Sequence, residues 1–328
     1  MKTKIWKIIA AIVAGLVLAV VGLLIYVKAF LPNVGDAPEI KITATPDMIK
    51  RGEYLANHVM VCIDCHSPRE WNKFAGPLKE GSEGAGGDVF DQNMGFPGTF
   101  TAKNITPANL GTWTDGEIFR AITTGVNKDG EAFFPVMPYK NYGKLDEEDI
   151  KAVIAYIRTL PAIQNNIEKS KADFPFNFIL NTIPSEANLT KRPSPDHVVE
   201  YGEYLTTAAA CADCHTNQVK GKIVGGLFGG GMEFKFVNGK ILRSPNLTPH
   251  PSGLGSWTKE AFIKRFKQYA DSSFVVPHVD MAKGEFQTVM PWIMYGGMTE
   301  EDLGAIYEYL RSITPVDNKV EKFTASLK

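Results

Sequence analysis

The sequence predicts an all-α protein in which one N-terminal transmembrane helix precedes two tandem helical units. Three observations predict this fold class. Residues 8–27 are apolar and uncharged, two long segments of the remaining chain repeat each other, and the clearest periodicity in both repeats is helical, with no long β-type alternation. The 328 residues leave room for two ordinary domains and a short extra element.

Composition and charge exclude several classes of protein. The chain is 44% hydrophobic, and its 35 Lys and Arg residues nearly balance 36 Asp and Glu residues. These values exclude a disordered chain, a multi-span membrane protein and a broadly basic nucleic-acid binder. Four lysines but no acid lie within residues 1–30: Lys2, Lys4, Lys7 and Lys28. The remaining chain has a net charge of −5, so we expect no nucleic-acid partner and salt-sensitive docking to basic protein surfaces.

Residues 1–30 are the predicted membrane anchor. The stretch IIAAIVAGLVLAVVGLLIYV at 8–27 would span about 30 Å as a helix, the thickness of a bilayer core. Three lysines precede it and one follows closely, which places the N-terminus in the cytoplasm. A cleaved signal peptide is the alternative, but its apolar region is only about 7–15 residues long. We therefore predict an uncleaved anchor in a bacterial inner membrane, with the rest of the chain in the periplasm.

Beyond an extended linker at 31–46, the chain repeats itself. Each half contains a Gly-Glu-Tyr-Leu, a Cys-x-x-Cys-His, an Asn-x-Thr-Pro, a Leu-Gly-x-Trp-Thr and a Val-Met-Pro. The paired positions are 52–55 and 202–205, 62–66 and 211–215, 104–107 and 246–249, 110–114 and 254–258, and 136–138 and 289–291. A repeat of about 150 residues is too long for a solenoid, so it indicates a tandem domain duplication.

The last helix of each half also repeats. Segments 146–161 and 299–315 both have apolar residues at helical spacing, an acidic first turn and a proline just beyond the end. We predict a first domain at 47–163, an interdomain linker at 164–195, a second domain at 196–316 and a C-terminal tail at 317–328. In the second domain we expect further helices before Cys211 and from Trp257 to about Tyr269. Long loops in both units indicate that something other than side chains fills the centre.

The cysteines indicate what fills the centre of each unit. Cys62-Ile-Asp-Cys65-His66 and Cys211-Ala-Asp-Cys214-His215 match the attachment signature of c-type haem. On one helical turn, positions i, i+3 and i+4 share a face, so both sulfurs can bond the haem vinyl groups while the histidine reaches the iron. A zinc site pooling both motifs and a thioredoxin-like pair are the alternatives, but the second needs a βαβ context. We predict two covalently bound haem c groups, which use all four cysteines and leave none for a disulfide.

Met137 and Met290 are the predicted sixth ligands of the two irons. Each stands in a Val-Met-Pro shortly before the last helix of its unit, and recurrence in register is not expected of ordinary core methionines. Met and His ligation raises the reduction potential and closes the iron to other ligands, which suits electron transfer. The second unit has about nine extra residues before Met290, and His278 within them is an alternative ligand.

Four further residues recur in register: Asn104 with Asn246, and Trp113 with Trp257. They either close loops and pack in the core or donate hydrogen bonds to buried haem propionates. The glycine runs at 81–87 and 225–231 are predicted to be loops that pass close to a haem edge. The remaining histidines, His58, His197 and His250, have no repeated partner and are interpreted as surface or loop residues.

These motifs resemble those of a known family. Two haem motifs, each followed by Met-Pro and a closing helix, look like a tandem of class I cytochrome c domains. The N-[IL]-T-P, L-G-x-W-T and M-P-[YW] motifs resemble the membrane-bound cytochrome c subunits of bacterial alcohol and gluconate dehydrogenases, over about 240 residues. Those subunits usually carry three haems, whereas this chain has two motifs. The resemblance implies one haem on Cys62, Cys65, His66 and Met137, and another on Cys211, Cys214, His215 and Met290.

The function expected from the motifs is electron transfer rather than catalysis. A membrane-tethered dihaem cytochrome would pass single electrons in a respiratory chain from a dehydrogenase or quinol-oxidising complex to an oxidase or soluble cytochrome. Different loops around the two haems predict different potentials. A dihaem peroxidase and a cytochrome c subunit of a terminal oxidase are the alternatives; the peroxidase would need one iron with an open or releasable site.

Overall fold

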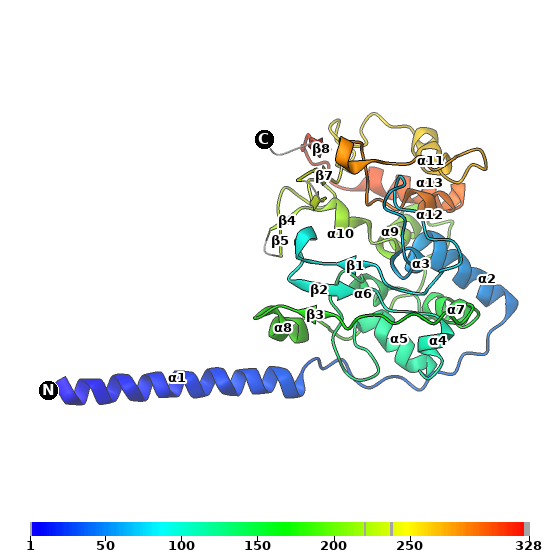
Figure 1. Ribbon diagram of the computed structural model, residues 1–328. Helices are drawn as coiled ribbons and strands as arrows, with labels where there is room; N and C mark the ends of the chain where they lie inside the picture. The colour runs from blue at the N-terminus through cyan, green and yellow to red at the C-terminus, as the bar shows by residue number, and fades with distance from the viewer. Residues whose placement is uncertain (1, 220, 237–238, 325–328) are drawn as a thin grey trace.

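The computed structural model describes residues 2–219, 221–236 and 239–324. A long N-terminal helix, α1 (Lys2–Phe30), projects from one edge of a folded body that contains all later elements (Figure 1). Met1 of the predicted anchor and residues 325–328 of the predicted tail lie outside the described residues.

Helix α1 has the length and composition of a membrane span. Within Thr3–Phe30, an 18-residue stretch has a mean hydropathy of 3.1, and none of that stretch is buried inside the protein. At 1.5 Å per residue, the 29 residues of α1 extend about 43 Å, more than a bilayer core requires. Length and composition alone also fit a signal sequence.

The predicted helices of the first unit are present. The final helix predicted at 146–161 is α7 (Glu147–Ile157), with Asp146 as its N-cap. The other helices of this unit and of the segment after it are α2 (Pro46–Tyr54), the π-helix η1 (Leu55–Val59), α3 (Cys62–Cys65), η2 (Gln92–Met94), α4 (Pro107–Leu110), α5 (Asp115–Thr124), α6 (Tyr139–Tyr142), α8 (Phe176–Ile179) and η3 (Leu180–Thr182).

The second unit has the same helical plan. The final helix predicted at 299–315 is α13 (Glu300–Ser312), and Thr299 is its N-cap. The expected helices before Cys211 and after Trp257 are α9 (Val198–Ala208) and α11 (Lys259–Lys267). The remaining helices are α10 (Cys211–His215), η4 (Met281–Lys283) and α12 (Trp292–Gly296).

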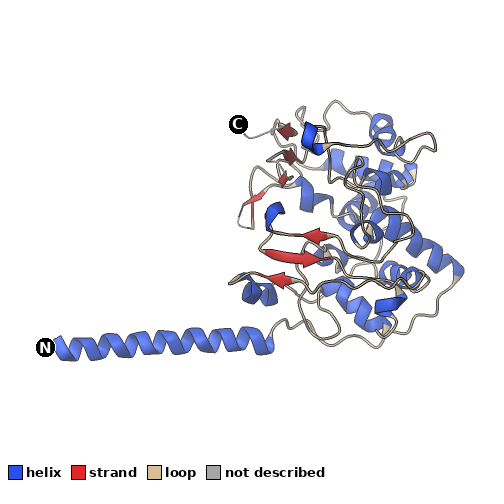
Figure 2. Ribbon diagram, viewed as in Figure 1, coloured by secondary structure: helices blue, strands red, loops and turns tan. Residues whose placement is uncertain are grey.

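The prediction of an all-α fold is wrong, because the body also contains three small antiparallel sheets (Figure 2). The first is β1–β2–β3, the second is the hairpin β4–β5, and the third is β6–β7–β8. The strands are β1 (Val89–Phe90), β2 (Gly98–Thr101), β3 (Lys171–Ala172), β4 (Gln218–Val219), β5 (Lys222–Ile223), β6 (Glu233–Lys235), β7 (Ile241–Arg243) and β8 (Phe323–Thr324). Strands of two to four residues are too short to leave an alternating pattern in the sequence.

The first and third sheets are equivalent parts of the repeat. In each, a two-stranded hairpin lies between the haem motif and the Asn-x-Thr-Pro segment, and a third strand is added by chain that follows the final helix. Strand β3 lies within the predicted linker at 164–195, and β8 lies within the predicted tail at 317–328. The predicted domain boundaries therefore leave out a strand that is hydrogen-bonded to each unit.

Each unit is built on a close helix crossing. Helix α2 packs against α7 in the first unit, and α9 packs against α13 in the second. A Cβ atom on Gly52 would lie 1.8 Å from the carbonyl oxygen of Ala152, and one on Gly202 would lie 2.0 Å from that of Ala305. The glycine of each Gly-Glu-Tyr-Leu motif is therefore required for the two backbones to meet.

The two units contact each other through reciprocal hydrogen bonds. The Tyr54 hydroxyl donates to Asp302 of the second unit at 2.6 Å, and the Tyr204 hydroxyl donates to Asp149 of the first unit at 2.8 Å. Each tyrosine oxygen also accepts the backbone N–H of the N-cap residue of the opposite final helix, at 3.1 Å in both cases. Equivalent residues thus exchange equivalent bonds, as in an isologous interface.

One residue interrupts the symmetry. Cys62 follows Gly52 by ten positions, whereas Cys211 follows Gly202 by nine. The extra residue is accommodated in η1, where the N–H of Met60 bonds the carbonyl of Leu55 at 2.7 Å, five residues back. A π-helical turn absorbs one inserted residue without moving the chain on either side.

Candidate functional site

Both haem motifs lie on short helices that start the same way. The residue before each first cysteine, Val61 or Ala210, is in the left-handed region at φ 47° or 51°. This backbone kink ends the preceding helix and starts α3 or α10 in a new direction. The cysteines and the histidine then follow on one helical turn, as the sequence predicts. Left-handed backbone at non-glycine residues has an energetic cost, and its recurrence marks a functional position.

Both motif histidines are oriented by a backbone carbonyl. Nδ1 of His66 lies 2.7 Å from the carbonyl oxygen of Lys103, and Nδ1 of His215 lies 2.9 Å from that of Pro245. A carbonyl only accepts, so Nδ1 carries the proton and Nε2 keeps its lone pair for a metal. Burial lowers the pKa of both imidazoles, which favours the same neutral form. This is the arrangement that a metal-binding histidine requires.

Glycines hold these carbonyls in place. A Cβ atom on Gly86 would lie 2.6 Å from the carbonyl carbon of Lys103, and one on Gly230 would lie 2.5 Å from that of Pro245. The N–H of each glycine also bonds the carbonyl of the motif histidine, at 2.7 and 2.8 Å. The glycine runs are therefore loops that position the histidines, a role the sequence analysis did not assign.

The four cysteines are unpaired thiols in the structure. Burial raises the pKa of Cys62 and of Cys211 to about 12, so both are neutral thiols at ordinary pH. Redox-active and nucleophilic cysteines have a lowered pKa, so these values do not fit a thioredoxin-like pair. Within the described residues, no three His, Cys, Asp or Glu side chains form a metal-binding group, as a pooled zinc site would need.

Met137 and Met290 occupy equivalent places. Each lies in the turn before a short helix, α6 or α12. Each side chain is half-buried against the main hydrophobic cluster, which runs through both units and includes Leu55, Ile150, Leu205 and Leu303. The same cluster is contacted by Cys62 and Cys211. Both methionines therefore pack against the same apolar core as the first cysteine of each motif, and their role as ligands stays a prediction.

His278, the alternative ligand, lies elsewhere. It is exposed and pairs with Lys73 of the first unit in an isolated antiparallel bridge. The N–H of Val279 bonds the carbonyl of Asn72 at 2.8 Å, and the amide of buried Gln287 donates to the carbonyl of Lys73, also at 2.8 Å. The inserted residues of the second unit thus dock on the first unit rather than line the interior near Met290.

The two asparagines close loops. The Asn104 amide donates to the carbonyl of Ile163 at 2.7 Å, and the Asn246 amide donates to that of Val316 at the same distance. Each side-chain oxygen accepts from the following threonine, Thr106 or Thr248. Both asparagines therefore fasten the chain that leaves the final helix, and donation to haem propionates stays a prediction.

The two tryptophans differ in their surroundings. Trp113 is half-buried and packs against the main cluster, and the Arg158 guanidinium donates to its carbonyl at 2.5 Å. Trp257 is at the border of exposure, and the Tyr307 hydroxyl donates to its carbonyl at 2.7 Å. The bonds recorded here fix the backbone, so the role of either indole near a propionate also stays a prediction.

One buried tyrosine in each unit bonds the backbone just before the Cys-x-x-Cys-His motif of that unit. The Tyr142 hydroxyl donates to the carbonyl of Met60 at 3.0 Å, and the Tyr295 hydroxyl donates to that of Ala209 at 2.8 Å. Burial raises the pKa of Tyr295 well above its ordinary value, so its hydroxyl stays protonated and can donate. Each hydroxyl thus fixes the backbone two residues before the first cysteine of its own unit.

The sequence analysis missed a buried ion pair beside the first motif. Arg69 lies 3.0 Å from Asp64, and the side chains of both are only 6% exposed. The guanidinium also donates to the carbonyls of Ala75 and Gly76 at 2.8 Å. Asp64 stands between Cys62 and Cys65, so this pair fixes the motif helix to the loop after it. A cavity of about 260 Å³ separates Asp64 from Pro291 and Met294 of the second unit.

The interpretation of His58 as a surface or loop residue is wrong. It lies in η1, its Nδ1 donates to the carbonyl of Met294 at 2.9 Å, and its ring fills the space above Gly297. His58, which lies in the π-helical turn that accommodates the extra residue, thus contacts the segment that follows Met290. A one-residue difference between two GEYL-to-Cys spacings was the available signal for this feature.

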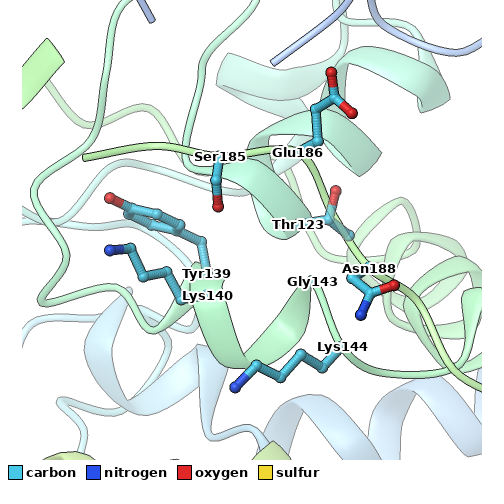
Figure 3. A pocket seen from close by; sticks show the side chains of 8 residues that line it. All are labelled: Thr123, Tyr139, Lys140, Gly143, Lys144, Ser185, Glu186 and Asn188. Atoms are coloured by element: carbon cyan, nitrogen blue, oxygen red, sulfur yellow. The ribbon is translucent and has the colours of Figure 1, made fainter. Parts of the chain in front are cut away.

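A further cavity lies beside α6 (Figure 3). Its volume is about 240 Å³, below the range of about 300–1,000 Å³ that is typical of ligand pockets. It is lined by Thr123, Tyr139, Lys140, Gly143, Lys144, Ser185, Glu186 and Asn188, and the buried Tyr139 hydroxyl has no hydrogen-bond partner. No cysteine or histidine of a haem motif lines this cavity.

Comparisons with known proteins indicate the class of protein to which the chain is similar. Residues 199–314 match the cytochrome c family. The chain is 26% identical over 305 residues to the cytochrome c subunit of alcohol dehydrogenase (quinone) from Gluconacetobacter polyoxogenes, covering 86% of this chain and 60% of the relative. It is 27% identical over 306 residues to the gluconate 2-dehydrogenase cytochrome c subunit of Pantoea cypripedii, covering 86% and 63%.

A third relative is shorter. The chain is 25% identical over 280 residues to a "diheme cytochrome c-type" protein of Cereibacter sphaeroides, covering 78% of this chain and 83% of the relative. The chain spans about 60% of the length of the two dehydrogenase subunits that it matches. It is therefore similar to the cytochrome c subunits of bacterial alcohol and gluconate dehydrogenases, and its residues 199–314 match the cytochrome c family.

Proposed function

We propose that the chain is a dihaem c-type cytochrome that transfers single electrons at a membrane. The first haem would be held by Cys62, Cys65, His66 and Met137, and the second by Cys211, Cys214, His215 and Met290. The observation that carries this proposal is the repeated histidine geometry. Two imidazoles, each on a Cys-x-x-Cys-His helix, present an unprotonated Nε2 because a carbonyl holds Nδ1.

The protein's own residues have distinct tasks at each site. The two cysteines of each site would hold the haem covalently, and the histidine Nε2 and the methionine sulfur would be the protein ligands of its iron. The bound haem supplies the one-electron redox step. The buried, loop-rich interior of each unit excludes water and leaves the histidine orientation fixed by Gly86 or Gly230. Such closed sites suit electron transfer more than reaction with small ligands.

The proposed partner is a dehydrogenase in or at the same membrane. Two relatives are cytochrome c subunits of alcohol and gluconate dehydrogenases, and α1 provides a candidate anchor. In this role the chain receives electrons from a dehydrogenase or quinol-oxidising complex and delivers them to an oxidase or soluble cytochrome. We propose that α1 stays uncleaved in the inner membrane and that the body lies in the periplasm. The chain itself then acts as an electron-transfer subunit and not as the catalytic one.

Ligand variants test the assignment of the methionines. We expect either Met137→Ala or Met290→Ala to remove about half of the near-infrared sulfur-to-iron band of the oxidised full chain, because each supplies one of two thioethers. Met281→Ala, in the inserted segment of the second unit, is the matched control and leaves the band unchanged. A band that survives both single substitutions would contradict the assignment.

Membranes of the native host test the pathway. We expect addition of a substrate of the associated dehydrogenase, such as an alcohol or gluconate, to reduce the haems of the full chain. Purification of the chain with a dehydrogenase supports the proposal. Purification with an oxidase core, or rapid reaction of one haem with hydrogen peroxide, would replace it with the oxidase or peroxidase alternative.

A further inference from the structure

The segment between α1 and the first unit is not a loose tether. The N–H of Ile42 bonds the Asp115 carboxylate at 2.9 Å, and the carbonyl of Pro38 lies so close to Gly116 that a Cβ there would be 1.7 Å away. Val34 is buried as well. The extended linker predicted at 31–46 is therefore fixed along the surface of the first unit, which holds the body next to the end of α1.

The last turn of α1 also contacts the body directly. Val27 is only 8% exposed, although the rest of α1 is almost wholly exposed. Helix α1 packs there against α8 and η3, and the Asn181 amide donates to the carbonyl of Val27 at 3.4 Å. Val27 is the last residue of the uncharged stretch, so α8 and η3 lie at the depth where a bilayer core would end.

Helix α8 presents apolar side chains at this depth. The eleven residues 174–184 contain no charged residue. Phe174 is 81% exposed and packs edge-on against Phe178, and Ile179 is exposed on the next turn. Tyr26 and Phe30 form a stacked aromatic pair at the same end of α1. Aromatic side chains at the end of a span are typical of a membrane–water interface.

A second apolar element lies at the same edge of the body. The β4–β5 hairpin exposes Val219 and Ile223. Figure 1 shows the hairpin and α8 on the side of the body from which α1 projects, with the hairpin farther from α1 than α8 is. Exposed Lys222 on this hairpin is suited to the headgroup region. Two apolar elements and the end of the anchor thus share one edge of the body. Exposed apolar residues gathered in this way indicate an interaction surface, whereas singly scattered ones do not.

We propose that the surface formed by Phe174, Ile179, Val219 and Ile223 rests on the outer leaflet of the same bilayer that α1 spans. The proposal rests on the proposed function, because it needs α1 to be an uncleaved anchor. The bilayer is favoured as the occupant because α8 packs against the last turn of α1, which puts its apolar side chains at the depth where the span ends. A redox partner protein covering this surface is the competing outcome.

This orientation has a consequence for electron transfer. Strand β4 begins three residues after His215, so the second haem motif lies on the membrane side of the body. Figure 1 shows α10 nearer to the α1 side than α3. The second site would then lie close to membrane-bound redox partners, and the first would lie farther into the periplasm.

Spin labels on the haem-loaded full chain test the proposal. Single Phe174→Cys and Ile223→Cys variants carry a nitroxide, and the protein is placed in phosphatidylethanolamine–phosphatidylglycerol vesicles. We expect oxygen to relax both labels strongly. We expect a water-soluble nickel complex to relax both labels several-fold less than it relaxes a label at Val275→Cys. Val275 is the matched control, since it is also apolar, is 84% exposed, and lies in the inserted segment after α11.

A label at Leu18→Cys, in the middle of α1, separates the two hypotheses. If this label is in lipid but the label at Phe174 or Ile223 is as accessible to nickel as that at Val275, the proposed surface is wrong and a protein partner is left as its occupant. If the Leu18 label itself is in water, the anchor of the proposed function fails. Labelling of further thiols beyond the introduced one would show that the haems are not attached.

Discussion

In the first unit, the aspartate between the motif cysteines is buried against a cation, whereas in the second it is exposed. Asp64 pairs with buried Arg69, and Asp213 accepts the Asn141 amide at 2.9 Å. The cysteine and histidine geometry is nevertheless the same in both units. The motif helix therefore does not depend on one particular support, and the two proposed haem sites differ in their electrostatic surroundings.

The same contrast appears at the interface between the units. Asp149 of the first unit is held by Tyr204 and by the guanidinium groups of Arg51 and Arg192, at 2.8 and 2.6 Å. The equivalent Asp302 accepts from Tyr54, and Tyr201 stands at the position that Arg51 has in the first unit. Symmetric geometry is thus combined with asymmetric charge, and matched substitutions in the two units measure the difference.

The largest expected effect is at the buried ion pair. Arg69→Ala leaves the Asp64 carboxylate buried without its cation, which costs about 3–5 kcal/mol of unfolding free energy. Asn141→Ala removes the partner of an exposed carboxylate and should cost no more than about 0.5 kcal/mol. Chemical denaturation followed by haem absorbance measures both. Equal costs would mean that the supports of the two motifs are equivalent after all.

The helix crossings should respond symmetrically. Gly52→Ala and Gly202→Ala each force a methyl group into a carbonyl of the facing helix, and we expect a loss of about 3 kcal/mol in both cases. Glu53→Ala and Glu203→Ala, the exposed neighbours, are the matched controls and should be nearly neutral. Thermal unfolding of the four variants checks this. A large effect in only one unit would show that the crossings are not equivalent.

The reciprocal tyrosines should respond unequally. Tyr54→Phe leaves Asp302 without its hydroxyl donor and without a cation, so we expect a loss of about 2 kcal/mol. Tyr204→Phe leaves Asp149 with two guanidinium partners, and the loss should be about 1 kcal/mol. Denaturation midpoints at constant m-value give the two costs. A larger loss for Tyr204→Phe would contradict the role assigned to Arg51 and Arg192.

The smallest expected effect is at His58, in the π-helical turn of the first unit. His58→Ala removes one hydrogen bond to the carbonyl of Met294, and we expect a loss of about 1 kcal/mol. His197→Ala, at an exposed position before α9, is the control and should be neutral. The potential of the second haem, read by potentiometric titration, is expected to shift in His58→Ala only, because Met294 follows Met290 by four residues. An unchanged potential would leave His58 a purely structural residue.

The sequence predicted the elements that have strong local signals. The final helices were found from caps, apolar spacing and prolines, and the motif helices were found from the cysteines. The short strands were not, because β3 and β8 each have two residues and pair with chain far away. The carbonyls that orient His66 and His215 lie about 30 residues or more from them, so only the folded chain brings these groups together.

The asparagines illustrate a different limit. Recurrence in register identified Asn104 and Asn246 as constrained residues, but it could not separate a loop-closing amide from a propionate donor. The structure shows that each amide bonds the chain after the final helix. The one-residue insertion was visible in the sequence, yet its accommodation as a π-helical turn depends on packing against α12, which no local pattern encodes.

The central claim is that each unit tethers one haem. Intact-mass measurement of the full chain, produced with the c-type maturation machinery, tests it most directly. We predict the mass of the polypeptide plus two haems, and plus one haem in either Cys62→Ala/Cys65→Ala or Cys211→Ala/Cys214→Ala. A wild-type chain that carries fewer than two haems, or a double variant that still carries two, would contradict the account.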